Sequence, residues 1–146
     1  PLTIAKAATK IQGQITSGNS SIAQRAALSA ITEDLKPTFE MTKTYHKRRD
    51  MMLDLLKEMP GVVTNVPTGA FYIFPDISSF FGKSDGETKV TNADDLAIYI
   101  LKKANVSVVT GTAFGAPNCI RISYAASDDE LKEAMQRLKK VLAELK

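Results

Sequence analysis

In the first part of the chain, apolar residues recur every three or four positions, which is the spacing of a helix face. The longest segment with this pattern covers residues 36–59. Its apolar positions, three, four or seven residues apart, are Met41, Tyr45, Met52, Leu56 and Met59. This spacing places them along one side of a helix. Pro37 suits the first helical turn, and Pro60-Gly61 ends the helix because proline disfavours helical geometry in the residue before it.

Two further helices are predicted before this one. Residues 2–15 form a weakly patterned, alanine-rich segment, and residues 16–21 (TSGNSS) have the composition of a loop. Ser21 and Gln24 have the spacing of a capping box, in which each side chain satisfies a backbone donor of the new helix. A second alanine-rich helix is therefore expected to begin at Ser21.

After residue 60 the pattern changes to short runs of β-branched and aromatic residues. The runs that predict strands are GVVTNV (61–66), GAFYIF (69–74), VSVV (106–109) and CIRISY (119–124). A helix with capping side chains at Thr91 and Asn92 separates the two pairs, and a last helix opens with a capping box at residues 127–130. This order predicts an α+β fold, in which a small sheet has helices packed on one face.

One strand of this sheet carries a permanent charge. Because successive side chains of a strand point to opposite faces, Ile120, Ile122 and Tyr124 are expected in the core, and Arg121 on the other face, between Cys119 and Ser123. A guanidinium presents a planar fork of donors that matches a carboxylate or phosphate. Arg121 is therefore a candidate anion-binding residue; the alternative is a solvated arginine paired with an acidic neighbour.

Composition narrows the function classes only a little. The 146 residues, 44% of them hydrophobic, suffice for one core, and a net charge of +3 is too slight to favour nucleic-acid binding. With a single cysteine no internal disulfide can form, which is compatible with a cytoplasmic location. No apolar run approaches the roughly 18 residues of a membrane helix, so no membrane association is expected.

Other reactive side chains have simpler interpretations. His46 lies in the basic stretch KTYHKRRD, where a solvated helix face is expected rather than a general base. Cys119 is expected to be a structural thiol, since the only histidine is on a distant helix. Neither residue has a partner of its own kind at ligand spacing, so no metal site is predicted.

Three segments, in order, resemble the class I aminotransferases, the pyridoxal-phosphate enzymes of fold type I, and most closely their aspartate aminotransferase branch. The segments are TSGNSSIAQRAAL (16–28), PTGAFYIFPDIS (67–78) and VVTGTAFGAPNCIRISYAAS (108–127). The last resembles the family's C-terminal signature, in which a PG..F segment leads to an (I/V)R(I/L)SYA.S strand. Thr110 departs from it, because the family usually has proline there.

The resemblance implies that Arg121 binds the α-carboxylate of an amino-acid substrate while pyridoxal 5'-phosphate acts as the electron sink. It also implies that residues 1–35 are the tail of the large cofactor-binding domain and residues 36–146 are the C-terminal small domain, with 36–59 as the interdomain helix. No segment matches the family's cofactor-binding lysine, its aspartate and tyrosine beside the ring, or its phosphate loop; Lys6 lacks the expected surroundings. These parts are expected to precede Pro1.

The chain is therefore interpreted as the C-terminal portion of a homodimeric aspartate aminotransferase. The complete protein is expected to transfer an amino group between an amino acid, aspartate or glutamate, and a 2-oxo acid, whereas the chain alone is expected to be inactive, with no cofactor bound and no catalytic residue of its own. The alternative, from a different class, is a free-standing small-molecule-binding or regulatory α+β module. A purely structural interaction domain is a third possibility.

Overall fold

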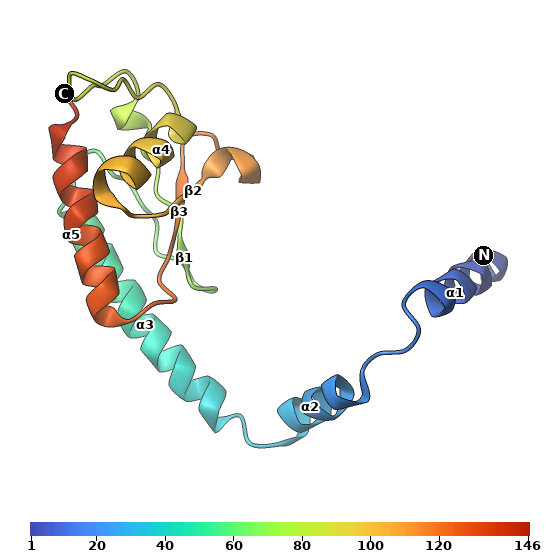
Figure 1. The fold of residues 1–146 in the computed structure, drawn as a ribbon. Helices are drawn as coiled ribbons and strands as arrows, with labels where there is room; N and C mark the ends of the chain where they lie inside the picture. Colours follow the sequence, from blue (N-terminus) through green and yellow to red (C-terminus); the bar gives the residue numbers. More distant parts are fainter. The chain divides into compact units, whose positions relative to one another are not determined.

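The computed structural model describes residues 1–146 and divides into two compact units, Pro1–Glu40 and Met41–Lys146. Figure 1 shows the order of the elements along the chain. The first unit holds α1 (Leu2–Ile15), α2 (Ser21–Thr32) and the beginning of α3 (Lys36–Lys57). Neither α1 nor α2 has a buried residue, so the hydrophobic core belongs to the second unit.

The start of α2 differs from the prediction in its capping. The N-cap is Ser20, which makes no side-chain capping bond, and Ser21 is already the first helical residue. The side chain of Gln24 donates to the carbonyl of Asn19 at 3.3 Å instead of closing a box with Ser21. The predicted capping box at this helix is therefore wrong, because the N-cap is Ser20 rather than Ser21, although the helix does begin at Ser21 as expected.

The second unit continues along α3 and adds a sheet and two helices. Its elements are β1 (Tyr72–Ile73), a 3-10 turn η1 (Ser78–Phe80), α4 (Ala93–Ala104), β2 (Val109–Thr110), a 3-10 turn η2 (Gly111–Phe114), β3 (Ile120–Ser123) and α5 (Asp128–Glu144). The strand order is β1-β3-β2, and both pairs are antiparallel. Because β3 is the central strand, Arg121 has a neighbouring strand on each side.

Both predicted helix starts in this unit are confirmed. Asn92 accepts a hydrogen bond from the backbone of Asp95 at 2.8 Å and caps α4. At α5 the capping box forms in full: Ser127 Oγ accepts from the backbone N–H of Glu130 (3.3 Å), and the Glu130 carboxylate accepts from the backbone N–H of Ser127 (3.0 Å). These bonds fix the chain direction directly after β3.

One core lies between the sheet and the helices. Ile73, Ile120 and Ile122 point into it from the strands, and each is at most 7% exposed. The helical residues that meet them are Met52, Leu53 and Leu56 from α3, Leu96, Tyr99 and Ile100 from α4, and Leu131, Met135 and Leu138 from α5. The α+β fold with helices on one face of a small sheet is thus confirmed.

α3 and α5 lie side by side (Figure 1) and run in the same direction. Arg48 near the middle of α3 pairs with Asp128 at the start of α5 at 2.9 Å, and Glu58 just past α3 pairs with Lys139 further along α5 at 2.7 Å. Met41, predicted on the buried stripe of α3, is 55% exposed. The buried part of α3 therefore begins only in its second half.

The strands are shorter than predicted. The run at residues 61–66 makes a single isolated bridge, between Val63 and Asp76, and Val66 is 62% exposed. The run at residues 106–109 reaches the sheet only at Val109, the first residue of β2. Sequence composition gives a residue's preference for extended backbone, but a strand also requires a neighbouring backbone, and each run pairs with one at a single residue only.

Candidate functional site

The uncovered face of the sheet carries Arg121 at its centre. The backbone pairs Val109 with Arg121 and Tyr72 with Ser123, so these four side chains share the face opposite the core. Ile120 and Ile122 of the same strand are buried, whereas Arg121 is half-buried and Ser123 is exposed. The predicted alternation along residues 119–124 is therefore confirmed.

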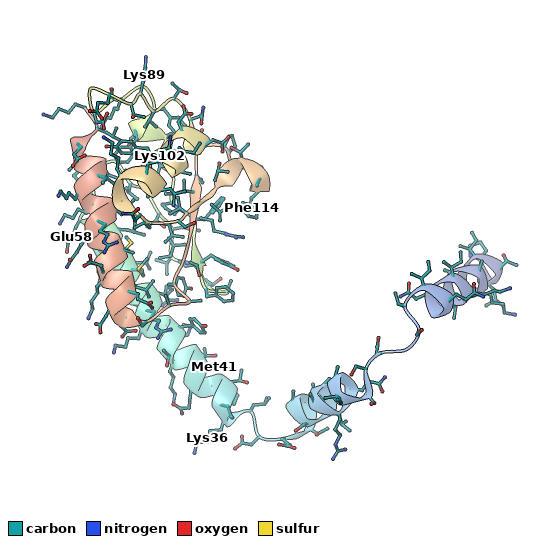
Figure 2. All side chains as sticks on the ribbon, viewed as in Figure 1. Lys36, Met41, Glu58, Lys89, Lys102 and Phe114 are labelled. Carbon is teal, nitrogen blue, oxygen red and sulfur yellow. The ribbon has the colours of Figure 1, made fainter.

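Two aromatic rings enclose the guanidinium of Arg121. Its Cζ atom lies 4.4 Å from the centroid of the Tyr72 ring and 4.5 Å from the centroid of the Phe114 ring. Tyr72 belongs to β1, and Phe114 ends η2 (Figure 2), the turn that follows β2. Both distances are well within the range of a cation–π contact, so the planar cation is held on the sheet rather than extended into solvent.

No carboxylate of the chain neutralises Arg121: none of the chain's salt bridges involves it. The two other partly buried arginines differ in this respect. Arg48 pairs with Asp128 at 2.9 Å, and Arg49 pairs with Asp50 at 2.8 Å. Of these three arginines, Arg121 alone keeps a charge that a ligand could neutralise.

A tight loop between β2 and β3 places Phe114. The backbone N–H of Gly111 donates to the carbonyl of Cys119 at 2.7 Å, and that of Ala116 donates to the carbonyl of Gly111 at 3.0 Å. The hydroxyl of Thr110 accepts from the backbone N–H of Thr112 and caps η2. Gly115, at φ 72°, ends the turn in the left-handed region that glycine tolerates.

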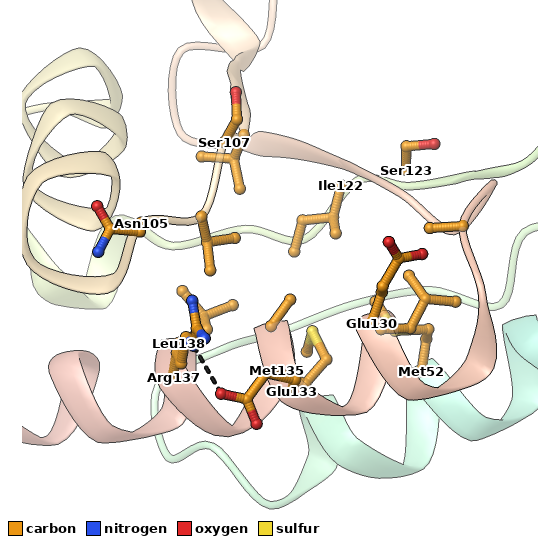
Figure 3. A pocket seen from close by; sticks show the side chains of 15 residues that line it. Met52, Asn105, Ser107, Ile122, Ser123, Glu130, Glu133, Met135, Arg137 and Leu138 are labelled. Carbon is orange, nitrogen blue, oxygen red and sulfur yellow. Dashed lines mark hydrogen bonds and ion pairs between the residues drawn. The ribbon is translucent and has the colours of Figure 1, made fainter.

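A cavity of the second unit lies on the other side of the sheet. It has a volume of about 450 Å³ and is lined by residues of β3, α5 and the segment after α4, among them Ile122, Met135 and Asn105 (Figure 3). The charged side chains Glu133 and Arg137 at its rim pair with each other at 2.7 Å. This cavity therefore presents mainly apolar side chains and is separate from Arg121, which points to the opposite face.

The remaining candidates are not brought to Arg121. His46 and Arg49 of α3 line a smaller cavity of about 240 Å³ together with Tyr124, which follows β3. Lys6 is exposed on α1. Cys119 is half-buried beside the arginine's strand, where burial and the charge of Asp76 raise the pKa of its thiol. A thiol with a raised pKa is a poor nucleophile at neutral pH.

The structure holds no cluster of three or more His, Cys, Asp or Glu side chains that could bind a metal ion. None of its helices combines the length and the hydropathy that a bilayer crossing requires. Every buried polar side-chain atom already has a hydrogen-bond partner within the chain.

Sequence reasoning found Arg121 but missed the two rings that enclose it. Tyr72 and Phe114 lie 49 and 7 residues away in the chain, and only the register of β1 against β3 and the turn at η2 bring them together. The tight spacing of Gly111 and Gly115 was the available signal that this loop places a particular side chain.

Comparison with known proteins gives one consistent family. A family model for aminotransferase class I and II matches residues 2–138. A bifunctional aspartate aminotransferase and glutamate/aspartate-prephenate aminotransferase of Petunia hybrida is 44% identical over 96% of this chain and 30% of its own length. An aspartate aminotransferase of Streptomyces avermitilis is 40% identical over 100% of this chain and 36% of its own length.

A solved structure agrees in fold. The aspartate aminotransferase from Rhizobium meliloti superposes with a TM-score of 0.91 at 36% identity, covering 100% of this chain and 37% of that one. An alanine aminotransferase from Pyrococcus furiosus gives a TM-score of 0.83 at 30% identity, covering 98% of this chain and 35% of that one. The chain spans about a third of the length of the relatives it matches.

Proposed function

Because the chain belongs to the family of class I and II aminotransferases, we propose that it is the C-terminal portion of an aspartate aminotransferase. In this proposal Arg121 binds the α-carboxylate of the substrate. The complete protein then transfers an amino group between aspartate or glutamate and a 2-oxo acid. It works as a cytoplasmic homodimer with pyridoxal 5'-phosphate. The chain alone is inactive.

One observation carries this proposal: Arg121 is half-buried on the uncovered face of the sheet, held between two rings, with no acidic partner in the chain. A carboxylate that approaches its free edge can accept two parallel N–H bonds. Binding at two oxygens fixes the rotation of the amino acid about its carboxylate axis, and this orients the bond at Cα that must break.

We expect the groups that hold the cofactor to lie outside this chain. No segment of the chain matches the one that carries the cofactor-binding lysine in this family. When bound to the complete protein, pyridoxal phosphate would supply the electron sink for loss of the Cα proton. The role we propose for this chain is confined to holding and orienting the substrate carboxylate.

We propose that residues 1–35 are a tail of the large domain and that residues 36–146 are the small domain, with 36–59 as the connecting helix. The exposed apolar surface of the first two helices supports this division. Large apolar side chains of α1 and α2 are exposed: Leu2, Ile4, Ile11, Ile15, Ile22 and Ile31 are each more than half accessible. Exposed apolar surface of this extent indicates a face that another part of a protein covers.

The test is made in the complete protein that carries this chain. Replacing Arg121→Ala is expected to lower kcat/KM for aspartate at least about 100-fold, because a charge-assisted bidentate pair is lost. Arg121→Lys is expected to recover part of that loss, since it restores the charge without the planar fork. Initial rates at a series of aspartate concentrations measure kcat and KM for each variant.

The matched control is Arg137→Ala, which removes an arginine that is 48% exposed and paired with Glu133 on α5. Its kcat/KM is expected to stay within about twofold of the unchanged protein. Equal kinetics for Arg121→Ala and Arg137→Ala would contradict the proposed carboxylate site and return Arg121 to the role of an ordinary surface charge.

A further inference from the structure

Two aromatic rings contact the guanidinium of Arg121, although anion binding by itself requires only the positive charge and the N–H donors. Because β1 and β2 flank β3 on opposite sides, Tyr72 and Phe114 reach the guanidinium from opposite sides of the central strand. Their ring centroids lie at nearly equal distances from Cζ, 4.4 and 4.5 Å. This is the arrangement expected when a planar cation is stacked between two rings, with its N–H edge left free.

The stack differs from the other cation–π contact that an arginine makes in this chain. Arg48 lies 6.0 Å from the Tyr45 ring, at the limit of such contacts, and it is oriented by Asp128 at 2.9 Å. For Arg121 the rings take the place of the carboxylate. They restrict the side chain without consuming the donors that a carboxylate would occupy.

Phe114 is held where it is by its own contacts. Its ring meets the edge of Phe74 at a centroid distance of 6.0 Å and an interplanar angle of 87°, and η2 ends directly after it at Gly115. Even so, Phe114 is 50% exposed. A large apolar ring that stays half in solvent contributes little to the core, so the energetic reason for its position lies in its contacts with Arg121 and Phe74.

We propose that Tyr72 and Phe114 are positioning residues that hold the Arg121 guanidinium in its binding orientation before the substrate arrives; this rests on the proposed function of Arg121. A free arginine loses rotamer freedom when it binds a carboxylate. A stacked arginine has lost that freedom on folding, so binding is stronger. The rings also replace part of the water around the cation, which strengthens its attraction to an anion.

The first measurement uses the 146-residue chain and needs no cofactor. The Nε–Hε resonance of Arg121, assigned by nuclear magnetic resonance, is expected to be displaced by the ring currents of its two neighbours. Phe114→Leu is expected to move it toward the position of a free arginine, and Phe114→Tyr to restore it. Phe81→Leu, a half-buried phenylalanine with no ring contact to Arg121, is the matched control and is expected to leave it in place.

The second measurement is kinetic and uses the complete protein. Phe114→Leu is expected to raise KM for aspartate about tenfold while kcat changes little, because the loss is in ground-state carboxylate binding. Phe114→Tyr is expected to recover the KM, which a purely structural defect would not show. The backbone amide spectrum of each variant verifies that the fold is kept.

The outcomes separate the two proposals. If Arg121→Lys raises KM but Phe114→Leu leaves both KM and the Nε–Hε resonance unchanged, the positioning role is overturned and the carboxylate site stands. If neither Arg121 variant affects KM, the proposed function fails, whatever the resonance does. A raised KM together with a displaced resonance in Phe114→Leu, both restored by tyrosine, supports the positioning role.

Discussion

Gly111 determines the path of the chain after β2. A Cβ atom at this position would lie 2.1 Å from the carbonyl oxygen of Ala116 and 2.5 Å from that of Cys119. Both are backbone atoms of the loop that Gly111 itself closes by hydrogen bonds. No side chain can be added there unless the loop moves, and Phe114 moves with it.

Gly111→Ala is accordingly expected to lower the free energy of unfolding by about 2 kcal/mol or more, the cost of forcing an atom into a filled site. Gly69→Ala is the matched control, because a Cβ atom there meets nothing within 4 Å and its φ is not positive. Urea unfolding of both variants measures the difference. Equal midpoints would contradict the close approach of the two carbonyls.

Thr110 replaces the proline usual in the family without disturbing the loop. Its φ of −63° is the value that a proline ring imposes, and its hydroxyl caps η2. Thr110 is opposite Ile120, and the next pair along the two strands, Gly111 and Cys119, is hydrogen-bonded. Because hydrogen-bonded and non-hydrogen-bonded pairs alternate in an antiparallel ladder, the N–H of Thr110 makes no bond to β3. The threonine therefore keeps the backbone geometry of a proline and adds a side-chain bond.

The residue pattern alone predicted the face of Arg121 correctly, because alternation is a local property of any strand. It could not predict Tyr72, whose place beside the arginine depends on strand register across 49 residues, nor Phe114, which depends on how a glycine turn folds. Long-range contacts of this kind are fixed by packing of the whole sheet.

Among the elements, the loop between η1 and α4 is held mainly by Asp85. Its carboxylate is only 7% exposed, accepts the backbone N–H groups of Thr88 (2.7 Å) and Glu87 (3.0 Å), and pairs with Lys103 of α4 at 3.1 Å. The hydrogen bond from Thr88, followed by that from Glu87 and the contact with Lys103, lowers the pKa of Asp85 to about 2.

This lowered pKa predicts a pH dependence of stability. The ionised carboxylate is favoured in the folded chain, so its contribution is complete above the ordinary pKa of 3.8 and is lost as the pH falls toward about 2. Asp85→Asn is expected to lower the urea midpoint at pH 7, and the gap from the unchanged chain is expected to shrink between pH 4 and pH 2.

Glu87→Gln is the matched control, since that carboxylate is 81% exposed and touches only Lys103. Only a small change in the urea midpoint at pH 7 is expected for it. A gap for Asp85→Asn that stayed constant from pH 7 to pH 2 would contradict the role given to these backbone bonds.

Element starts were predicted better than strand lengths. The caps at Asn92 and Ser127 depend on side chains within three residues, and the structure contains both. The extended runs at residues 61–66 and 106–109 are mostly unpaired, because pairing needs a second backbone that the sequence pattern does not specify. At α2 the predicted first residue, Ser21, is right, but the predicted capping box does not form, because the N-cap is Ser20.

At the scale of the whole molecule, the chain forms one hydrophobic core, and we propose that it supplies only part of a substrate site. The residues that form the core lie between Met52 and Leu145. The proposed carboxylate site consists of one arginine and two rings on an open face, with no general base beside them. Folding and activity are therefore expected to separate in this chain.

The isolated 146-residue chain is accordingly expected to form no glutamate above background when mixed with aspartate, 2-oxoglutarate and pyridoxal phosphate, because no segment of it matches the one that carries the family's cofactor-binding lysine. A coupled assay of glutamate measures it, with the complete protein as positive control and free cofactor as blank. Turnover above the blank, abolished by Arg121→Ala, would show that the chain contains a full active site after all.

The central position of β3 has one more consequence, for folding fidelity. A slip of its pairing by one residue would turn the guanidinium of Arg121 into the apolar layer and Ile120 and Ile122 out to solvent. Burying an unpaired cation is among the costliest errors a small protein can make. The positive charge of Arg121 thus also destabilises sheets with a shifted register and favours the native pairing of β3.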